Sequence, residues 1–356
     1  MSEFGEQNKI SALQAKFDAQ KIAFAPIVFQ ATLALRNLGI LDLLLKKRKS
    51  GVDTQTVAED LNLPLYGVKV LLEAGLGAEL VYQEDDRYHL TKTGYFILTD
   101  PLTQVNMNFV ADICYDSMPR LEDSIVNEKP LGLESFGDWK TIYEGLSQLP
   151  EKAQKSWFEF DHYYSDIAFP LVLPQVFASN PKHIVDVGGN TGRWTKCCLE
   201  FNDQVHVSIV DLPGQLDKAK TQLNDAGFAG RFSTQALDLL QDDGHFPAQA
   251  DVIWMSQFLD CFSETQITRI LQRARTGMEK NTRLYILETF WDRQQFTASA
   301  FSLVNTSLYF TCIANGNSKM YHSNDLKRCA ETAGLVLKQQ TDDIGIGHTL
   351  LEYALT

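Results

Sequence analysis

The sequence is short of positive charge. Its 356 residues hold 32 Lys and Arg against 45 Asp and Glu, a formal net charge of −13. Nucleic-acid backbones are bound by clustered cations, so this balance argues against nucleic-acid binding as the main activity. No apolar run approaches the roughly 20 residues of a membrane helix, and the opening MSEFGEQNK lacks the order of a signal peptide. We therefore expect a cytoplasmic protein that binds neither nucleic acid nor a membrane.

Cysteine is also scarce, and its spacing fits no metal site. The six cysteines are Cys114, Cys197, Cys198, Cys261, Cys312 and Cys329. Two of them are adjacent and the others stand alone, so no CxxC pair is present. The expectation is free thiols in a reducing compartment and no bound metal. Internal repeats and low-complexity segments are absent as well, which excludes a solenoid.

What is present is an ordinary globular composition, 44% hydrophobic and 22% charged, long enough for two domains. Residues 10–47 are predicted to be helical. Around 31–45 the apolar residues cover almost every side, which predicts burial in the same domain or against another subunit. Residues 52–81 predict two helices joined by a turn at Asn62–Pro64, with Asp53 or Thr54 as the first cap.

A two-stranded hairpin with its tip at Glu84–Arg87 completes the order of a winged helix. The helix that would enter a DNA groove, LYGVKVLLEAGLGAEL, offers one Lys and two Glu. That is the wrong charge for a phosphate backbone, so a structural or dimerising role is favoured. The rival hypothesis, a winged-helix transcriptional regulator with a sensor domain, would need a basic face that residues 52–92 lack.

The remainder divides at Pro181. Residues 103–180 are predicted to be helical, with Pro170 and Pro174 breaking or kinking the last helix. From 181 onward, short β-branched runs alternate with helical stretches, the rhythm of a parallel α/β sheet. The tail predicts a helix closing at Gly334 and then two strands, which gives seven strands with an antiparallel last one. The expected domains are 1–102, 103–180 and 181–356.

The first strand of this part ends in a glycine-rich turn, HIVDVGGNTGRW, residues 183–194. A dinucleotide site needs G-x-G-x-x-G, but counted from Gly188, Asn190 takes the second glycine position and Arg193 the third. This failure argues against a nicotinamide oxidoreductase. A Walker loop fails too, because no Gly-Lys-Ser/Thr follows. The turn therefore predicts a ligand that approaches the backbone closely and is not held through a phosphate group.

Acidic residues stand at three successive strand ends. Asp186 precedes the glycine turn, Asp211 lies 19 residues beyond Gly192, and Asp238 ends the third strand. The second is placed to accept hydrogen bonds from ribose hydroxyls, and the third from an exocyclic amine. A ligand with ribose, adenine and an amine but no phosphate fits this set, and S-adenosylmethionine is the common metabolite of that kind.

The order DVGGNTG, VDLP, ALDLL, SQFLDCFSE, LYILE, AGL, after a winged-helix-like domain and a helical linker, resembles the class I S-adenosylmethionine-dependent small-molecule O-methyltransferases. These are enzymes of the acetylserotonin, caffeate and bacterial polyketide-tailoring type. The resemblance implies a Rossmann-like sheet, a homodimer through the N-terminal domain, and a small aromatic hydroxylated acceptor in secondary metabolism. The implied cofactor contacts are Asp186, Gly188, Gly189, Gly192, Asp211, Leu212, Asp238, Leu239, Ser256 and Gln257.

The segment SQFLDCFSE departs from the family pattern. The family has Leu-His-Asp-Trp there, with the His as general base, whereas Asp260 takes the His position and Cys261 the Asp position. Two glutamates flank that His in the family; Glu288 matches the first, and the second falls on Met320. The resemblance thus implies a cofactor site that is kept and a base site that is rebuilt around Asp260 and Glu288.

The change matters because a neutral phenol must lose its proton. The pKa of a phenol is about 10. The pKa of His, near 6.5, is about 3–4 units lower, and that of an unperturbed Asp is about 6 units lower. For Asp, full proton transfer therefore costs roughly 8 kcal/mol. Burial of Asp260 among Phe258, Leu259 and Phe262 would raise its pKa and narrow that gap.

Four roles for Asp260 stay open at this point. It is a tuned base for O-methylation, the favoured hypothesis, or it orients an acceptor that is methylated at a ring carbon. A third role is to face an acceptor that is already ionised, such as a carboxylate. In the fourth, Asp260 takes no part and the site is inactive, although a buried unpaired carboxylate is costly to keep without a use.

The helix FEFDHYYSD, residues 158–166, is expected to cover the cofactor and the acceptor. His162 is the alternative general base there. By resemblance, a later helix also contacts the acceptor. The predicted acceptor contacts are Phe160, Tyr163, Tyr164, Asn305, Leu308 and Tyr309. A purely local role is expected for His322.

Overall fold

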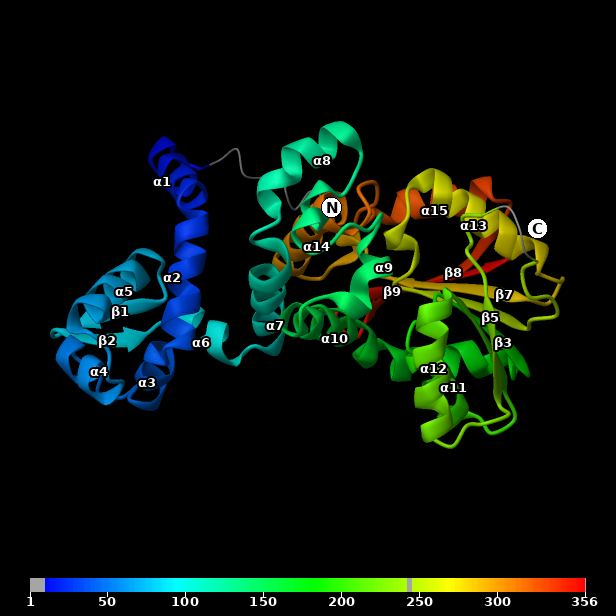
Figure 1. Ribbon diagram of the computed structural model, residues 1–356, viewed down its shortest axis with the longest axis horizontal. Helices are drawn as coiled ribbons and strands as arrows, with labels where there is room; N and C mark the ends of the chain where they lie inside the picture. Colours follow the sequence, from blue (N-terminus) through cyan, green and yellow to red (C-terminus); the bar gives the residue numbers. More distant parts are fainter. Residues whose placement is uncertain (1–9, 242–244, 356) are drawn as a thin grey trace. The chain divides into compact units, whose positions relative to one another are not determined.

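The computed structural model describes residues 10–241 and 245–355, and the chain forms two compact units, Met1–Asn108 and Phe109–Thr356 (Figure 1). The first unit holds two short strands, β1 (Val81–Glu84) and β2 (Arg87–Leu90). Its helices are α1 (Ala12–Ala23), α2 (Ala25–Asn37), α3 (Ile40–Lys46), α4 (Thr54–Asp60), α5 (Leu65–Gly77) and α6 (Lys92–Thr99). Helix α7 (Pro101–Phe109) runs to the end of this unit.

The winged-helix-like order predicted for this unit is confirmed. Asp53 caps α4 by accepting a hydrogen bond from the Thr56 backbone N–H at 2.9 Å. Between α4 and α5, Asn62 has a φ of 51°, a left-handed conformation that Asn tolerates in turns. Strands β1 and β2 pair in antiparallel fashion up to Glu84 and Arg87, the predicted tip.

The apolar stretch that was predicted to be buried, residues 31–45, lies in α2 and α3, and Leu33 and Leu35 of α2 are buried. Ile40, Leu41 and Leu44 of α3 lie in the core of this unit, where each is at most 1% exposed. Helix α1 has no buried residue among those described. No single helix within 10–241 and 245–355 is both long and apolar enough to cross a membrane; α2 and α3 pass that test only as a pair, bent by 57°.

The second unit is built on a seven-stranded sheet. Its strands are β3 (His183–Val187), β4 (His206–Asp211), β5 (Phe232–Ala236), β6 (Val252–Ser256), β7 (Arg283–Glu288), β8 (Val336–Ile344) and β9 (His348–Ala354). They lie in the order β5-β4-β3-β6-β7-β9-β8. All pairs from β5 to β7 are parallel, and β9 runs antiparallel to both of its neighbours. The prediction of seven strands with an antiparallel last strand is confirmed.

Helices cover both faces of this sheet (Figure 1). The α-helices of the unit are α8 (Leu121–Asn127), α9 (Ile142–Gly145), α10 (Glu151–Val176), α11 (Arg193–Phe201), α12 (Pro213–Asp225), α13 (Glu264–Thr276), α14 (Thr297–Tyr309) and α15 (Ser323–Thr332). One apolar core joins the sheet to α11, α12 and the end of α10, and a second joins it to α13 and α15. The chain builds outward from β3 to β4 and β5 and then crosses back to β6, so the strand order reverses between the neighbours β3 and β6, where α/β sheets bind ligands.

A third core cluster holds the helices that stand beside the sheet. It includes Ile113, Leu133, Ile142, Trp157 and Ile313, from five separate segments of the chain. Two of these segments are π-helical turns that continue helices, η2 (Val110–Cys114) after α7 and η9 (Phe310–Ala314) after α14. Such turns are frequent at functional sites, because they re-aim the side chains that follow.

The break predicted at Pro170 and Pro174 is wrong, because α10 is one helix that continues past both, and the alternative, a kink, stays a prediction. Each proline removes one N–H donor. The buried face of this half of the helix, with Ala168, Val172 and Val176 each at most 1% exposed, keeps it packed against the sheet.

Candidate active site

Two cavities open at the carboxyl ends of the parallel strands, both lined by residues of the second unit. The small cavity, about 70 Å³, is lined by residues that include His162, Asp186, Gly189, Arg193 and Ser256. The large cavity, about 350 Å³, is lined by residues that include Asp211, Asp238, Asp260, Tyr309 and Met320. Asp161, Gly188, Asn190 and Gln257 line both, so the two cavities are contiguous.

The glycine turn after β3 forms the floor between them. Gly188 has a φ of +70°, and a side chain built on it would reach 2.3 Å from the Phe258 ring. At Gly189 a Cβ would lie 2.6 Å from Ile209. Both positions therefore exclude a side chain, and the bare backbone of the turn faces the cavities.

Gly192 has a different reason to be glycine. It lines neither cavity; its φ is +80°, and it is the N-cap of α11. A Cβ there would meet Leu223 of α12 at 3.1 Å. The structure therefore gives it a role in the turn and in helix packing, and its predicted contact with the cofactor has no support from the cavities.

Asp186, at the end of β3, is 2% exposed and lines the small cavity. Its Oδ2 accepts a hydrogen bond from the Thr195 hydroxyl at 2.6 Å, which ties the strand to α11. Burial raises the pKa of Asp186 to about 7, an effect that the Thr195 hydrogen bond opposes.

Asp211 fixes the glycine turn from the next strand. Its two carboxylate oxygens accept from the Asn190 backbone N–H at 2.8 Å and from the Leu212 N–H at 2.6 Å. Burial raises its pKa, and these two hydrogen bonds lower it. Each oxygen keeps a further lone pair, and Asp211 lines the large cavity together with Leu212.

Asp238 lies two residues beyond the end of β5 and lines the large cavity. Its Oδ1 accepts from the Leu240 backbone N–H at 2.9 Å, and its Oδ2 accepts from the Gln241 side chain at 3.3 Å. Leu239 also lines this cavity and is 6% exposed. A carboxylate held by its own loop beside apolar side chains suits a flat, polar-edged ring.

Asp260 comes directly after β6, in the short 3-10 turn Leu259–Cys261. It is 7% exposed and lines the large cavity, and its Oδ1 accepts from the Cys261 thiol at 3.5 Å. Burial raises the pKa of Asp260 to about 6. The sequence prediction that apolar neighbours tune this carboxyl upward agrees with this direction.

Glu288, at the end of β7, supports this turn from behind. It is 2% exposed and lines neither cavity, and its Oε1 accepts from the backbone N–H groups of Phe258 and Leu259 at 3.0 and 2.9 Å. Its burial, and then the charge of Asp260, raise its pKa well above the usual value. Glu288 thus positions the turn that carries Asp260, and its predicted contact with the acceptor has no support from the cavities.

The predicted alternative base, His162, lies in the small cavity and not in the large one that Asp260 lines. Within the described part of the chain its Nε2 has no hydrogen-bond partner, and this atom lies 3.9 Å from Asp161 Oδ2. Burial lowers the pKa of His162 to about 4, so the ring is neutral near pH 7. Because His162 lies beside Arg193, we expect it to contact the amino-acid end of a cofactor and not the acceptor.

Aromatic side chains wall the large cavity. Phe160, Tyr164 and Tyr309, three of the predicted acceptor contacts, line it, and Trp157 joins them. The Trp157 indole N–H donates to the Tyr309 hydroxyl at 2.7 Å, which fixes both rings. A planar aromatic molecule fits between such walls.

The other three predicted acceptor contacts, Tyr163, Asn305 and Leu308, line neither cavity. Asn305 is exposed and donates to the Phe301 carbonyl, one turn back along α14, at 2.8 Å. The buried face of α14 runs through Ala300 and Leu303, and helical geometry turns Asn305 away from it.

The sequence did not point to several residues of the site. Tyr143 and Thr141 come from the segment around α9, a single helical turn without a motif. Asp161, which lines both cavities, stands next to His162 in the aromatic segment, and only its acidic type could have marked it. Arg193 of the small cavity was noted only as a failed glycine position.

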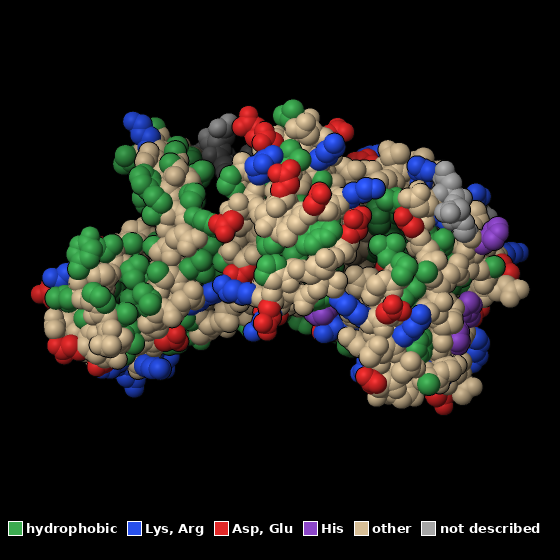
Figure 2. Space-filling view, in the orientation of Figure 1, with side chains coloured by type: hydrophobic (Ala, Val, Ile, Leu, Met, Phe, Trp, Pro, Cys, Tyr) green, Lys and Arg blue, Asp and Glu red, His purple; other side chains and the backbone are tan. Residues whose placement is uncertain are grey.

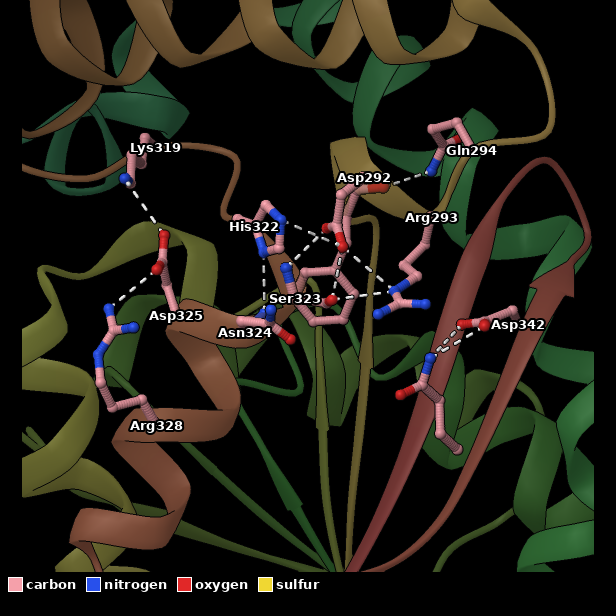
Figure 3. Close-up of polar contacts among 12 residues, drawn as sticks. Asp292, Arg293, Gln294, Lys319, His322, Ser323, Asn324, Asp325, Arg328 and Asp342 are labelled. Carbon is pink, nitrogen blue, oxygen red and sulfur yellow. Dashed lines mark hydrogen bonds and ion pairs between the residues drawn. The ribbon is translucent and has the colours of Figure 1, made fainter. Parts of the chain in front are cut away.

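A second polar cluster lies outside both cavities, at the start of α15 (Figure 3). Asp292 accepts from the Ser323 backbone N–H and hydroxyl, each at 2.7 Å, and its Oδ2 lies 3.6 Å from His322 Nε2. The other ring nitrogen of His322 accepts from the Asn324 N–H at 3.1 Å and so caps α15. His322 therefore has the local role that the sequence predicted.

Within residues 10–241 and 245–355, no group of three His, Cys, Asp or Glu side chains stands where it could hold a metal ion. All six cysteines are unpaired, and four of them are buried. The cradle of bare backbone at Gly188 and Gly189, and the unpartnered buried oxygens of Asn190, Ser256 and Gln257, fit a polar cofactor without phosphate. This set is compatible with the S-adenosylmethionine that the sequence predicted.

Comparison with known protein families gives two matches. Residues 138–335 match the model of an O-methyltransferase domain, and residues 16–88 match that of a Dimerisation2-like domain. Among characterised relatives, the bacteriochlorophyllide d C-20 methyltransferase of Chlorobaculum tepidum is 22% identical over 71% of this chain and 73% of its own length. The 3-hydroxy-5-methyl-1-naphthoate 3-O-methyltransferase of Streptomyces sahachiroi is 24% identical over 67% of this chain and 68% of its own.

Solved structures share the fold over almost the whole chain. The S-adenosylmethionine-dependent methyltransferase SibL superposes with a TM-score of 0.71, at 22% identity, over 94% of this chain and 98% of its own. Human N-acetylserotonin methyltransferase gives a TM-score of 0.64, at 17% identity, over 98% and 99% of the two chains.

Proposed function

The chain belongs to the O-methyltransferase family and is an S-adenosylmethionine-dependent methyltransferase, and we propose that it methylates a hydroxyl group of a small aromatic acceptor in secondary metabolism. The observation that carries this proposal is the joint placement of Asp211 and Asp260 on one cavity. The first is bound to the glycine turn, and the second is a nearly buried carboxyl between aromatic walls. Cofactor and acceptor groups would therefore meet in one water-poor space.

When bound, S-adenosylmethionine supplies an electrophilic methyl group on its sulfonium. The chain's own part is to hold both reactants in line and to exclude water. We assign the ribose hydroxyls to Asp211 and the adenine edge to Asp238, with Leu212 and Leu239 against the ring. The amino-acid end belongs to the small cavity, which the Arg193 guanidinium and the Asp186 carboxyl both line. Gly188, Gly189, Ser256 and Gln257 complete this surface.

Asp260 is assigned to the acceptor hydroxyl. Its Oδ1 accepts from the Cys261 thiol at 3.5 Å, and the carboxylate keeps further lone pairs that can accept the hydroxyl proton. Because burial brings the pKa of Asp260 to about 6, the carboxylate is a stronger base than an exposed aspartate and is still ionised at pH 7. Glu288 acts through the backbone that it holds. Phe160, Tyr164 and Tyr309 clamp the acceptor ring. Methylation of a ring carbon beside the hydroxyl would use the same groups.

The protein is further proposed to act as a cytoplasmic homodimer through its first unit, without a metal. The match to a Dimerisation2-like domain supports the dimer. So do the apolar side chains that gather along α1 and α2 (Figure 2): Leu13, Ile22 and Ile27 are 79%, 76% and 64% exposed. An apolar patch of this kind marks an interface. The functional division into 1–102, 103–180 and 181–356 is kept as part of this proposal.

Calorimetric titration with S-adenosylhomocysteine tests the cofactor assignment. We expect one site per chain, with an affinity that dialysis against a chelator leaves unchanged. Light scattering of the same sample should give twice the 40.1 kDa mass of one chain. No binding of the nucleoside would contradict the proposed function, and a monomer would contradict the dimer.

A further inference from the structure

The charge of the large cavity is of one sign. Five acidic residues line it, Glu144, Asp161, Asp211, Asp238 and Asp260, and no Lys, Arg or His does so within the described part of the chain. The small cavity, in contrast, is lined by a cation, Arg193, which forms an ion pair with Asp166. An anionic end of the cofactor can thus be held in the small cavity, but the large cavity offers no partner to an anionic acceptor.

Two of the five carboxylates are left for the acceptor. Asp211 and Asp238 already accept backbone N–H groups and line the part assigned to the nucleoside. Glu144 is exposed. Asp161 and Asp260 remain, contributed by α10 and by the turn after β6.

Neither of these two carboxylates has a salt bridge to a Lys or Arg among the described residues, although Arg193 is close enough to lower the pKa of Asp161. Asp260 is 7% exposed, and the contact to its carboxylate comes from the weak thiol donor of Cys261 at 3.5 Å. The Asp161 carboxylate has no hydrogen bond within the described residues; its nearest ring nitrogen, in His162, is 3.9 Å away. A buried carboxylate without a strong donor, such as that of Asp260, is costly unless a ligand supplies the donor, and the partly exposed Asp161 has acceptor oxygens left for the same ligand.

The walls beside them suit a flat ring with a positive edge. Trp157, Phe160, Tyr164 and Tyr309 line the same cavity, and their ring faces attract a cation as well as an apolar surface. Phe160 is fixed from behind by stacking on Phe109, with centroids 4.1 Å apart. The cavity therefore combines rigid aromatic faces with two carboxylates that lack partners.

We propose that Asp161 is a specificity-determining residue which, with Asp260, makes the acceptor cavity select aromatic hydroxyl compounds bearing a cationic nitrogen and reject those bearing a carboxylate. The inference rests on the proposed function, because it names the substrate class of the same site. Asp260 accepts the proton of the hydroxyl that is methylated, and Asp161 pairs with the ammonium or ring N–H. Carboxylate methylation, one of the open roles of the site, is thereby excluded.

The electrostatics of the pair agree with this assignment. Burial, and then the charge of Asp260, raise the pKa of Asp161 to about 7, while Arg193 lowers it. The negative charge of Asp260 thus already disfavours ionisation of Asp161 in the same site. A third one on the acceptor would be repelled more strongly, whereas a cation would favour the ionised form of both carboxyls.

Three matched probes test the proposal: 2-naphthol, 6-(aminomethyl)-2-naphthol and 6-hydroxy-2-naphthoate, which are neutral, cationic and anionic. Their binding to the full chain is measured by tryptophan quenching at pH 7.5, with and without saturating S-adenosylhomocysteine. We expect the cation to bind most tightly and the naphthoate at least about 30-fold more weakly than 2-naphthol. Equal binding of the naphthoate and 2-naphthol would overturn the proposal, as would binding of none of the three.

Substitutions in α10 test whether Asp161 is the residue that sets the charge preference. Asp161→Asn should strengthen naphthoate binding by about 10-fold and remove the preference for the cation, whereas Asp161→Glu keeps both. Glu159→Gln is the matched control, because it removes one charge from the exposed side of α10, where Glu159 pairs with Lys155. If Asp161→Asn fails to fold, Asp260→Asn serves in its place, with the same expected loss of discrimination. Retained discrimination in the variant that folds would overturn the assignment.

The S-adenosylhomocysteine titration separates this inference from the proposed function. Loss of nucleoside binding with the charge preference of the probes intact would refute the methyltransferase assignment and leave the cavity's selectivity standing. Normal nucleoside binding with no charge preference would refute the selectivity alone.

Discussion

Glu288 Oε1 accepts a hydrogen bond from the backbone N–H of Leu259 at 2.9 Å, and this contact fixes the residue that precedes Asp260. The same oxygen accepts from the Phe258 N–H at 3.0 Å. A carboxylate on β7 therefore shapes the turn that ends the neighbouring strand β6, with which it is in parallel register. Asp260 can project into a largely apolar cavity because a second acid, outside the cavity, holds its backbone.

Two substitutions separate this positioning role from a catalytic one. Glu288→Gln keeps an oxygen that accepts both N–H groups and should lower turnover less than about 10-fold. Glu288→Leu leaves two buried N–H groups without a partner, which costs about 1–3 kcal/mol each. We expect it to lower kcat at least about 100-fold. Similar losses for both variants in steady-state assays would argue that the charge of Glu288 takes part in the reaction.

Asp211→Ala is expected to weaken S-adenosylhomocysteine binding by at least about 100-fold, because hydrogen bonds to a charged group are worth about 1.5–3 kcal/mol each. The variant also frees the Asn190 N–H that shapes the glycine turn. Calorimetry measures the loss, and Asp225→Ala, at the exposed end of α12, is the matched control. Unchanged affinity in Asp211→Ala would refute the ribose assignment.

The strand ends were predictable because a short local sequence pattern marks each of them. Asp186 and Asp211 close short β-branched runs, and parallel strands bring such ends to one edge of a sheet. Gly188 was marked by its neighbours in the motif, and the structure confirms that a side chain there would collide with Phe258. The winged-helix order and the hairpin were likewise predictable from turn residues and from the alternation of apolar and polar residues.

The acceptor side was less predictable, because its residues converge from segments with no motif. Tyr143 lies in a four-residue helix, and Asp161 shares its helix with aromatic residues that are equally consistent with a core. Asn305 was placed by analogy with a family helix, but it lies on the exposed face of α14, away from the buried Ala300 and Leu303.

Asp260→Asn should leave S-adenosylhomocysteine affinity within about twofold and lower kcat by about 100-fold or more, because the amide cannot accept the hydroxyl proton. His162→Ala, in the small cavity, should instead raise the KM for S-adenosylmethionine and change kcat little. Both are measured on the natural acceptor or a hydroxylated naphthalene that is turned over. The opposite pattern would make His162 the base and Asp260 a binding group.

The reaction should be faster at higher pH. Asp260 must be ionised to accept a proton, and burial raises its pKa to about 6; the pKa of Asp161 is raised to about 7. We therefore expect kcat/KM to rise between pH 5 and 7 and to level off above the second value. The pKa of His162 is about 4, so His162→Ala should show the same profile. A profile that is flat from pH 5 to 8 in the wild type would mean that no carboxyl of this pair titrates in catalysis.

The same burial has a cost in stability that Asp260→Asn should reveal. The pKa of Asp260 rises from its usual 3.8 to about 6 on folding, so the folded state binds the proton more tightly than the unfolded one. The contribution of this proton to stability is complete below pH 3.8 and is lost as the pH rises through 6. Asn carries no charge, so the variant does not share this loss.

Relative to the wild type, Asp260→Asn should therefore gain stability as the pH increases, by about 1.5 kcal/mol between pH 5 and pH 8. Urea unfolding of both proteins at the two values measures the difference. Asp186 titrates in both proteins, so its contribution largely cancels, whereas the pKa values of Asp161 and Glu288, which the Asp260 charge raises, fall in the variant and add to its relative gain. A variant that loses stability relative to the wild type between pH 5 and pH 8 would show that a partner stabilises the ionised Asp260. The carboxylate would then be a structural group and a weaker base than the mechanism requires.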